Sequence, residues 1–139
     1  MSIPRIIIDS DAYNQVDDQF AVTYALLSPE VSVEALYAAP FVREHACSPE
    51  EGMQKSYEEL LRVQWAMGRE VPVYRGASHF FGHGADRSEA VMDLMQRGPV
   101  TVVAIGALTN VACALTYCPA LQDSLSVLWL GGQAGGQQD

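Results

Sequence analysis

The sequence predicts an α/β fold: a Rossmann-like open sheet of mostly parallel strands with helices on both faces. Short runs of β-branched and apolar residues alternate along the chain with longer stretches whose apolar residues recur at helical spacing. Runs such as 6–8 and 102–105 are continuously apolar, which is typical of strands buried on both faces. The 139 residues are enough for one core. We expect a single domain over 1–133 and an unstructured tail over 134–139.

The first strand is predicted at residues 5–9 and is followed by a helix that ends before a Ser-Pro pair. Phe20, Tyr24 and Leu27 recur at helical spacing in this helix, so we expect them to form its buried stripe. Alternating apolar residues then predict a second strand over 31–39.

The next helix has the clearest boundary signals in the chain. Ser48 is suited to the N-cap, Pro49 to the first helical position, and Glu51 completes a capping box three residues after the cap. We expect the helix to continue to about residue 67, where Gly68 ends it. Its core-facing stripe is predicted to be Met53, Tyr57, Leu60, Leu61 and Gln64.

The same alternation continues to the last apolar run. Breaks at glycine and proline separate the segments, and residues between them carry either strand or helix periodicity. The remaining predicted elements are a strand over 71–74, a loop over 75–85, a helix over 88–97, a strand over 99–105, a helix over 111–117 and a strand over 126–130.

The charge composition of the chain argues against some classes of binding partner. Eight lysines and arginines against 17 aspartates and glutamates give a formal charge of −9, and no basic stripe is present, which argues against nucleic acid and anionic membranes as partners. No apolar run approaches the roughly 20 residues of a membrane span, and no signal peptide is recognisable. Cys47, Cys113 and Cys118 follow neither a disulfide nor a zinc spacing. We therefore expect a cytoplasmic protein with reduced thiols.

Four aspartates, Asp9, Asp11, Asp17 and Asp18, are concentrated between the first predicted strand and the first predicted helix. In open α/β sheets, ligands bind at the edge where strands end. Carboxylates held close together repel one another, so at neutral pH either a cation lies among them or one of them keeps a proton. The sequence therefore predicts a metal site at this edge.

Other interpretations of these residues remain open. An Asp-x-Asp pair at a strand end also serves Mg²⁺-dependent phosphoryl transfer in haloacid-dehalogenase-like enzymes, although Ala12-Tyr13 follows the pair here. Acids at a helix start can simply complement the helix dipole. His79 and His83 lie in a predicted loop and could reach the mouth of a pocket, or could be solvated.

Three segments together resemble the amino-terminal half of the inosine/uridine-preferring nucleoside hydrolase family. They are IIIDSDAYNQVDDQFAVTYAL, VTVVAIGALTNVACAL and LWLGGQ. The family begins with a strand ending in Asp-x-Asp, has Asp-Asp at the following helix start, and later shows Gly-x-Leu-Thr-Asn and a Gly-Gly after an apolar strand. The resemblance implies a nucleoside hydrolase-like sheet and Ca²⁺-dependent hydrolysis of the N-glycosidic bond of a ribonucleoside.

The resemblance also implies roles for individual residues. Asp11 matches a calcium ligand beside the attacking water, and Asp18 matches the bidentate calcium ligand. Thr109 matches the position whose backbone carbonyl completes the calcium shell on this side. The substrate-binding positions correspond to Asp17 and Asn14, and the structural positions to Asp9 and Asn110. An all-oxygen ligand set suits Ca²⁺.

The chain also departs from the family pattern. The turn between Asp11 and Asp17 is two residues longer than usual, and Phe41-Val42-Arg43 stands where many members carry a ribose-binding Asn. The family's second half, which supplies further ribose and calcium ligands, has no counterpart in the sequence. We therefore expect a homo-oligomer or a missing carboxyl-terminal half. Two functions remain open: a nucleoside N-ribohydrolase of which this chain carries the metal-binding half, or a non-catalytic remnant that binds calcium, a riboside or a partner chain.

Overall fold

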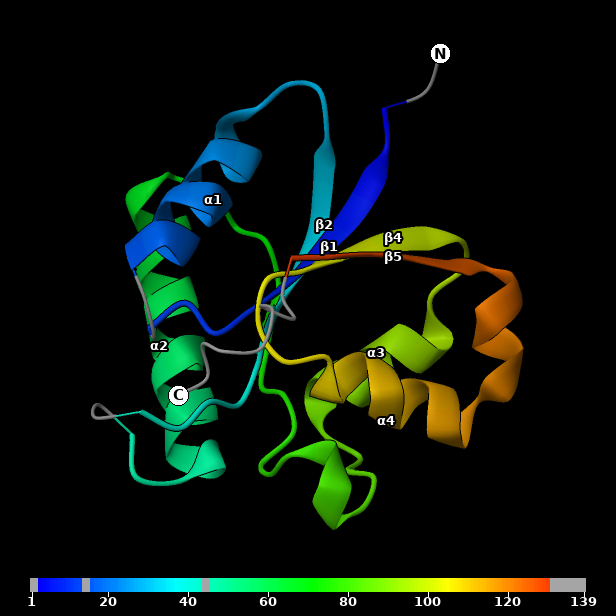
Figure 1. Ribbon diagram of the computed structural model, residues 1–139. Helices are drawn as coiled ribbons and strands as arrows, with labels where there is room; N and C mark the ends of the chain where they lie inside the picture. Colours follow the sequence, from blue (N-terminus) through cyan, green and yellow to red (C-terminus); the bar gives the residue numbers. More distant parts are fainter. Residues whose placement is uncertain (1–2, 14–15, 44–45, 131–139) are drawn as a thin grey trace.

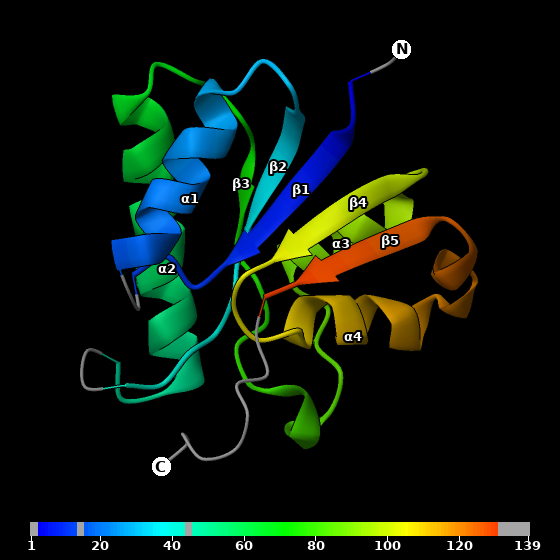
Figure 2. The same ribbon diagram turned by 45° about the horizontal axis from the view of Figure 1, so that its top comes forward.

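The computed structural model of the chain describes residues 3–13, 16–43 and 46–130 and has a five-stranded parallel sheet at its centre. The strand order is β3-β2-β1-β4-β5, which Figure 2 shows from left to right. This confirms the predicted α/β open sheet. The strands are β1 (Arg5–Ser10), β2 (Ser32–Ala38), β3 (Val73–Tyr74), β4 (Val100–Ala104) and β5 (Leu125–Trp129).

Helices pack on both faces of the sheet (Figure 1). The helices α1 (Val16–Leu27) and α2 (Pro49–Ala66) cover one face, where Ile6 and Ile8 of β1 belong to their apolar cluster. The helices α3 (Glu89–Gln96) and α4 (Thr109–Tyr117) cover the other face, where Ile7 of β1 belongs to their apolar cluster. Successive residues of β1 thus point into two separate cores, which explains why the run is continuously apolar. Two 3₁₀ turns, η1 (Phe81–His83) and η2 (Pro119–Asp123), complete the described elements.

The central strand β1 marks the point where the chain reverses its direction across the sheet. The chain proceeds from β1 to β2 and β3 on one side and then returns to β4 and β5 on the other side. Asp9 at the end of β1 pairs with Tyr37 of β2 and Ala104 of β4. In open parallel sheets, a crevice forms outside the carboxyl ends of the strands at this reversal. The aspartate-rich segment therefore follows the strand at the expected ligand-binding edge.

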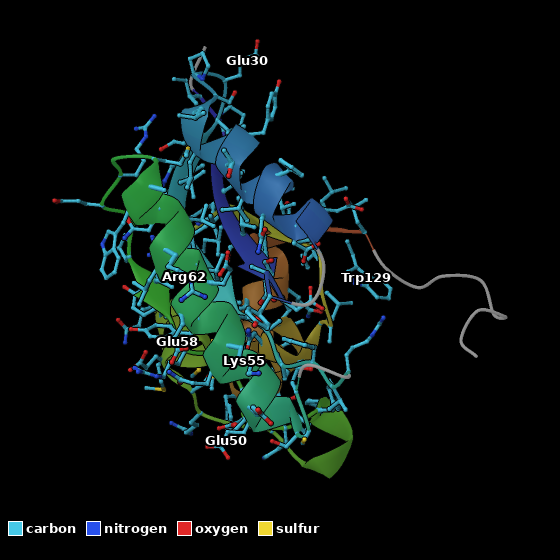
Figure 3. The ribbon with its side chains drawn as sticks, turned by 90° about the vertical axis from the view of Figure 1, so that its left-hand side faces the viewer. Glu30, Glu50, Lys55, Glu58, Arg62 and Trp129 are labelled. Carbon is cyan, nitrogen blue, oxygen red and sulfur yellow. The ribbon has the colours of Figure 1, made fainter. Side chains whose placement is uncertain are left out.

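The predicted boundaries of α2 are confirmed. Ser48 Oγ accepts a hydrogen bond from the backbone N–H of Glu51 at 3.1 Å, and Glu51 Oε1 accepts one from the N–H of Cys47 at 2.8 Å. The helix ends before Gly68, whose φ of 70° lies in the left-handed region that favours glycine. Met53, Leu60 and Gln64 of the predicted stripe are buried, whereas Tyr57 and Leu61 are only partly buried. Figure 3 shows Glu50, Lys55, Glu58 and Arg62 on the outward side of this helix.

The predicted buried stripe of α1 is wrong. Phe20, Tyr24 and Leu27 are 69%, 75% and 56% exposed, and among the α1 side chains that the structure describes, Val22 and Leu26 are buried. Because apolar residues are present on nearly every side of this helix, two stripes satisfy the helical spacing. The packing of α1 against the sheet and α2 selects the stripe of smaller side chains, which permits closer approach.

Several boundaries differ from the prediction. Only Val73–Tyr74 pair as a strand in the predicted segment 71–74, because β3 is a short edge strand beside β2. The helix α4 begins at Thr109, two residues before the predicted position, and the predicted loop 75–85 contains the turn η1. None of the described helices is long and apolar enough to cross a membrane. The predicted tail over 134–139 lies outside the described residues.

Candidate active site

Asp9 lies at the centre of the carboxyl edge of the sheet and is completely buried. Its Oδ2 accepts a hydrogen bond from Asn110 Nδ2 at 3.0 Å, whereas its Oδ1 has no hydrogen-bond partner among the described residues. Burial raises the pKa of the Asp9 carboxyl to about 7; the hydrogen bond from Asn110 opposes this shift, and the charge of Asp11 adds to it. A buried carboxylate with one unpaired oxygen is costly unless a proton or a cation compensates its charge.

Asn110, in the first turn of α4, links the start of this helix to three other segments at the carboxyl edge of the sheet. Its Nδ2 donates to Asp9 at the end of β1 and also to the carbonyl of Ala38 at the end of β2, at 3.1 Å. Its Oδ1 accepts from the N–H of Ala77, which follows β3, at 2.8 Å. These bonds use the amide of Asn110 as donor and acceptor at once. The side chain therefore fixes the relative positions of the strand ends that surround the site.

Gly76 is needed for this arrangement because the backbone approaches too closely for a side chain. A Cβ atom at this position would lie 1.8 Å from the carbonyl oxygen of Ala38 and 2.6 Å from Asn110 Nδ2. These separations are far below van der Waals contact, so the backbone itself would have to move. Sequence reasoning missed Gly76; the available signal was a glycine two residues after a predicted strand.

Asp11 and Asp18 face each other across the segment that joins β1 to α1. Their side chains are in hydrogen-bonding contact, and Ser10 Oγ donates to Asp18 Oδ2 at 3.1 Å. Burial and, after it, the neighbouring Asp11 together raise the pKa of the half-buried Asp18 carboxyl to about 8, against the effect of the hydrogen bond from Ser10. Two carboxyl groups this close share a proton unless a cation replaces it. The sequence analysis missed Ser10, whose position between two aspartates was the only signal.

The other predicted site residues are less closely gathered. Asp17 is exposed at the start of α1, and Thr109 is buried at the start of α4. Asn14 lies outside the described residues. Within the part of the chain that the structure describes, no three His, Cys, Asp or Glu side chains are grouped closely enough to hold a metal ion. The structure thus brings Asp11 and Asp18 together as a pair, and the charge of Asp11 also acts on Asp9.

Of the three histidines, the structure describes the side chain of His79. His79 Nδ1 lies 3.3 Å from the carbonyl oxygen of Phe80, within its own loop. Beside His79, Asp86 accepts hydrogen bonds from the N–H and the hydroxyl of Ser78, which hold the loop closed on itself. His45 lies outside the described residues. The prediction that His79 or His83 reaches the pocket mouth stays a prediction.

A parallel open sheet with paired carboxyl groups at its reversal point defines an α/β protein with an acidic site at the carboxyl edge. The family model described as inosine-uridine preferring nucleoside hydrolase matches residues 6–139. Since this match spans nearly the whole chain, the chain belongs to that family. This match confirms the family predicted from the sequence.

Curated relatives agree with the family match. The chain is 26% identical to the non-specific ribonucleoside hydrolase RihC of Escherichia fergusonii over 165 residues, and 27% identical to that of Escherichia coli O1:K1 over 157 residues. Each alignment covers 97% of this chain and 51% of the relative. The chain therefore spans about half the length of the curated relatives it matches.

Solved structures share the fold over the same extent. A purine-preferring ribonucleoside hydrolase from Gardnerella vaginalis superimposes with a TM-score of 0.70 at 23% identity and covers 92% of this chain and 48% of its own. An inosine-guanosine nucleoside hydrolase gives a TM-score of 0.73 at 20% identity and covers 96% of this chain and 50% of its own. These similarities show that the open sheet is the fold of half of a nucleoside hydrolase.

Proposed function

We propose that this chain carries the metal-binding half of a nucleoside N-ribohydrolase site, in which water cleaves the N-glycosidic bond of a ribonucleoside. The observation that carries this proposal is the contact between Asp11 and Asp18 at the reversal point of the sheet. Breaking an N-glycosidic bond develops positive charge on the ribose, and nearby carboxylates stabilise such charge. The family membership and the names of the relatives support the same reaction class.

The metal we propose is Ca²⁺, held by the side chains of Asp11 and Asp18 and by the backbone carbonyl of Thr109. These donors are all oxygen atoms, which suits calcium. A cation would also remove the conflict between the two carboxyl groups, because its charge replaces the proton that they otherwise share. Calcium takes about six to eight ligands, so water and groups from outside this chain would supply the remainder.

In this proposal each residue has a separate task. Bound calcium lowers the pKa of a coordinated water. The Asp11 carboxylate accepts a proton from the attacking water, for which it must be ionised. The exposed Asp17 holds ribose hydroxyl groups, as does Asn14, which lies outside the described residues. Asp9 and Asn110 keep the strand ends in place, as their hydrogen bond indicates.

Because the chain matches only half of its relatives' length, we propose that a complete site needs the other half of the family domain or a second copy of this chain. The alternative function is a non-catalytic protein that binds calcium, a riboside or a partner chain. It is favoured by the pairing of only two carboxyl groups, without a third ligand residue, in the described part. Release of ribose from inosine by the purified chain would separate the two functions.

The proposal is tested by calcium titration of Asp11→Ala and Asp18→Ala, with Asp123→Ala as the matched control. Asp123 is exposed in η2, ahead of β5 and therefore at the opposite edge of the sheet. We expect saturable calcium binding in the unaltered chain and in the control, and its loss in both site variants. Equal calcium affinity in all four proteins would refute the assignment.

A further inference from the structure

The indole of Trp129 is bonded to the turn that follows β4. Its Nε1–H donates to the carbonyl oxygen of Gly106 at 3.0 Å, while the N–H of the next residue, Leu130, donates to Ala104 at 3.0 Å. Trp129 is the last residue of β5 (Figure 3) and pairs with Ala104 in the parallel register. The end of β5 is therefore joined to β4 by a backbone bond, and to the turn beyond β4 by a side-chain bond.

Gly106 in turn packs directly against Asp11. A Cβ atom at Gly106 would lie 3.2 Å from Asp11 Cγ, Oδ1 and N. This spacing would be tighter than ordinary contact, so the turn lies close beside Asp11 with no room for a side chain between them. Three residues after Gly106 the same turn reaches Thr109, which is buried at the start of α4. One short segment thus borders Asp11 at one end and supplies the Thr109 carbonyl at the other.

The exposure of Trp129 suggests why an indole is present. The side chain is 44% exposed on an edge strand, so burial of the ring is incomplete. An indole is a hydrogen-bond donor only, and the Gly106 carbonyl is an acceptor at a turn where ladder bonds have ended. A phenylalanine could contact the same atoms but could not donate. The hydrogen bond, rather than core packing, therefore distinguishes tryptophan from phenylalanine at this position.

We propose that Trp129 is a positioning residue for the candidate metal site. Its indole holds the turn of residues 106–109 against Asp11 and so fixes the Asp11 carboxylate and the Thr109 carbonyl relative to each other. Trp129 acts through Gly106 and is not assigned any contact with the substrate. The link to calcium rests on the proposed function, whereas the fixing of the turn and of Asp11 does not.

The experiment compares Trp129→Phe with Trp65→Phe. The chain has two tryptophans, and Trp65 is 64% exposed at the end of α2, which makes it a matched control. Without metal, we expect Trp129→Phe to accelerate amide hydrogen exchange at residues 106–109 by about tenfold, the effect of losing one hydrogen bond. The carboxyl ¹³C signal of Asp11 should shift as well. Trp65→Phe should change neither, and circular dichroism should show that both variants remain folded.

A second measurement concerns calcium. Trp129→Phe should raise the calcium Kd by about tenfold, with no change for Trp65→Phe. Unchanged exchange at 106–109, or an unchanged Asp11 signal, in Trp129→Phe would overturn the proposal. Unaltered calcium affinity in a variant whose turn is loosened would also contradict it. If the unaltered chain binds no calcium, the proposed function fails, and the exchange rates and the Asp11 signal still decide whether Trp129 positions Asp11.

Discussion

Asp9 shows how burial determines the behaviour of a single carboxyl group. Its pKa of about 7 in the folded chain exceeds its ordinary value of 3.8, so the folded state holds a proton that the unfolded state has already lost. Asp18, with a pKa raised to about 8, acts in the same direction. We therefore expect the metal-free chain to lose stability as the pH rises from about 4 to about 8.

Urea unfolding of the metal-free chain at a series of pH values measures this effect. Asp9→Asn keeps the acceptor for Asn110 and removes the charge, so the decline should be shallower in this variant. A free energy of unfolding that stays level or increases over the same pH range would contradict the raised pKa values. Calcium should restore stability at the alkaline end, because it binds the ionised carboxylates.

A substitution tests the close approach of the Gly76 backbone to Ala38 and Asn110. Gly76→Ala places a methyl group against the Ala38 carbonyl and the Asn110 amide, and should lower the free energy of unfolding by about 3 kcal/mol. Gly82→Ala is the control, because no atom lies within 4 Å of the Cβ that it adds. Thermal unfolding of both variants checks the prediction. Equal melting temperatures would show that the edge is not packed as described.

The residues of the site differ in how far the sequence could reveal them. The spacing of Asp9, Asp11 and Asp18 between a strand and a helix places them at the correct edge, because strand ends in a parallel sheet meet there. The contacts of Asn110 with Ala38 and Ala77 join residues far apart in the chain, and no local pattern encodes them. The roles of all these residues in metal or substrate binding stay predictions.

At the scale of elements, local signals predicted α2 well and the orientation of α1 poorly. The start of α2 depends on Ser48 and Glu51, which contact only neighbouring residues, so the sequence carries the whole signal. The orientation of α1 depends on what packs beside it, and its nearly all-round apolar sequence leaves this open. The two-residue strand β3 likewise depends on pairing with β2.

The corrected orientation of α1 is tested by a pair of truncations. Val22→Ala removes atoms from a completely buried side chain and should cost about 2 kcal/mol of unfolding free energy. Tyr24→Ala, two residues later on the exposed side, should cost less than about 0.5 kcal/mol. Chemical denaturation gives both values. The reverse ranking would restore the stripe predicted from the sequence.

At the scale of the whole molecule, the two faces of the sheet are unequally covered. In Figure 2, α3 lies behind β4 and β5 and α4 lies below β5, whereas no described helix lies in front of these strands. Val103 pairs with Leu128, so both side chains point to this open face, and Leu128 is 56% exposed. An exposed apolar face beside an edge strand favours association.

We expect the open face to bind a hydrophobic dye and to promote association at high concentration. Leu128→Lys should reduce both effects, since a charge on the face opposes apolar contact. Met92→Lys, on α3 at the opposite face, is the control and should leave both unchanged. Dye fluorescence and light scattering provide the measurements. Identical behaviour of the two variants would indicate that association does not involve this face.

The central claim is that the carboxyl edge holds half of a nucleoside hydrolase site, and calorimetric calcium titration with and without inosine tests it most directly. Light scattering on the same samples gives the oligomeric state. We expect saturable calcium binding that becomes tighter when inosine is present, because the proposed site places ribose hydroxyls beside the metal. Absence of saturable calcium binding under either condition would mean that this chain has the family's fold without the metal site proposed for it.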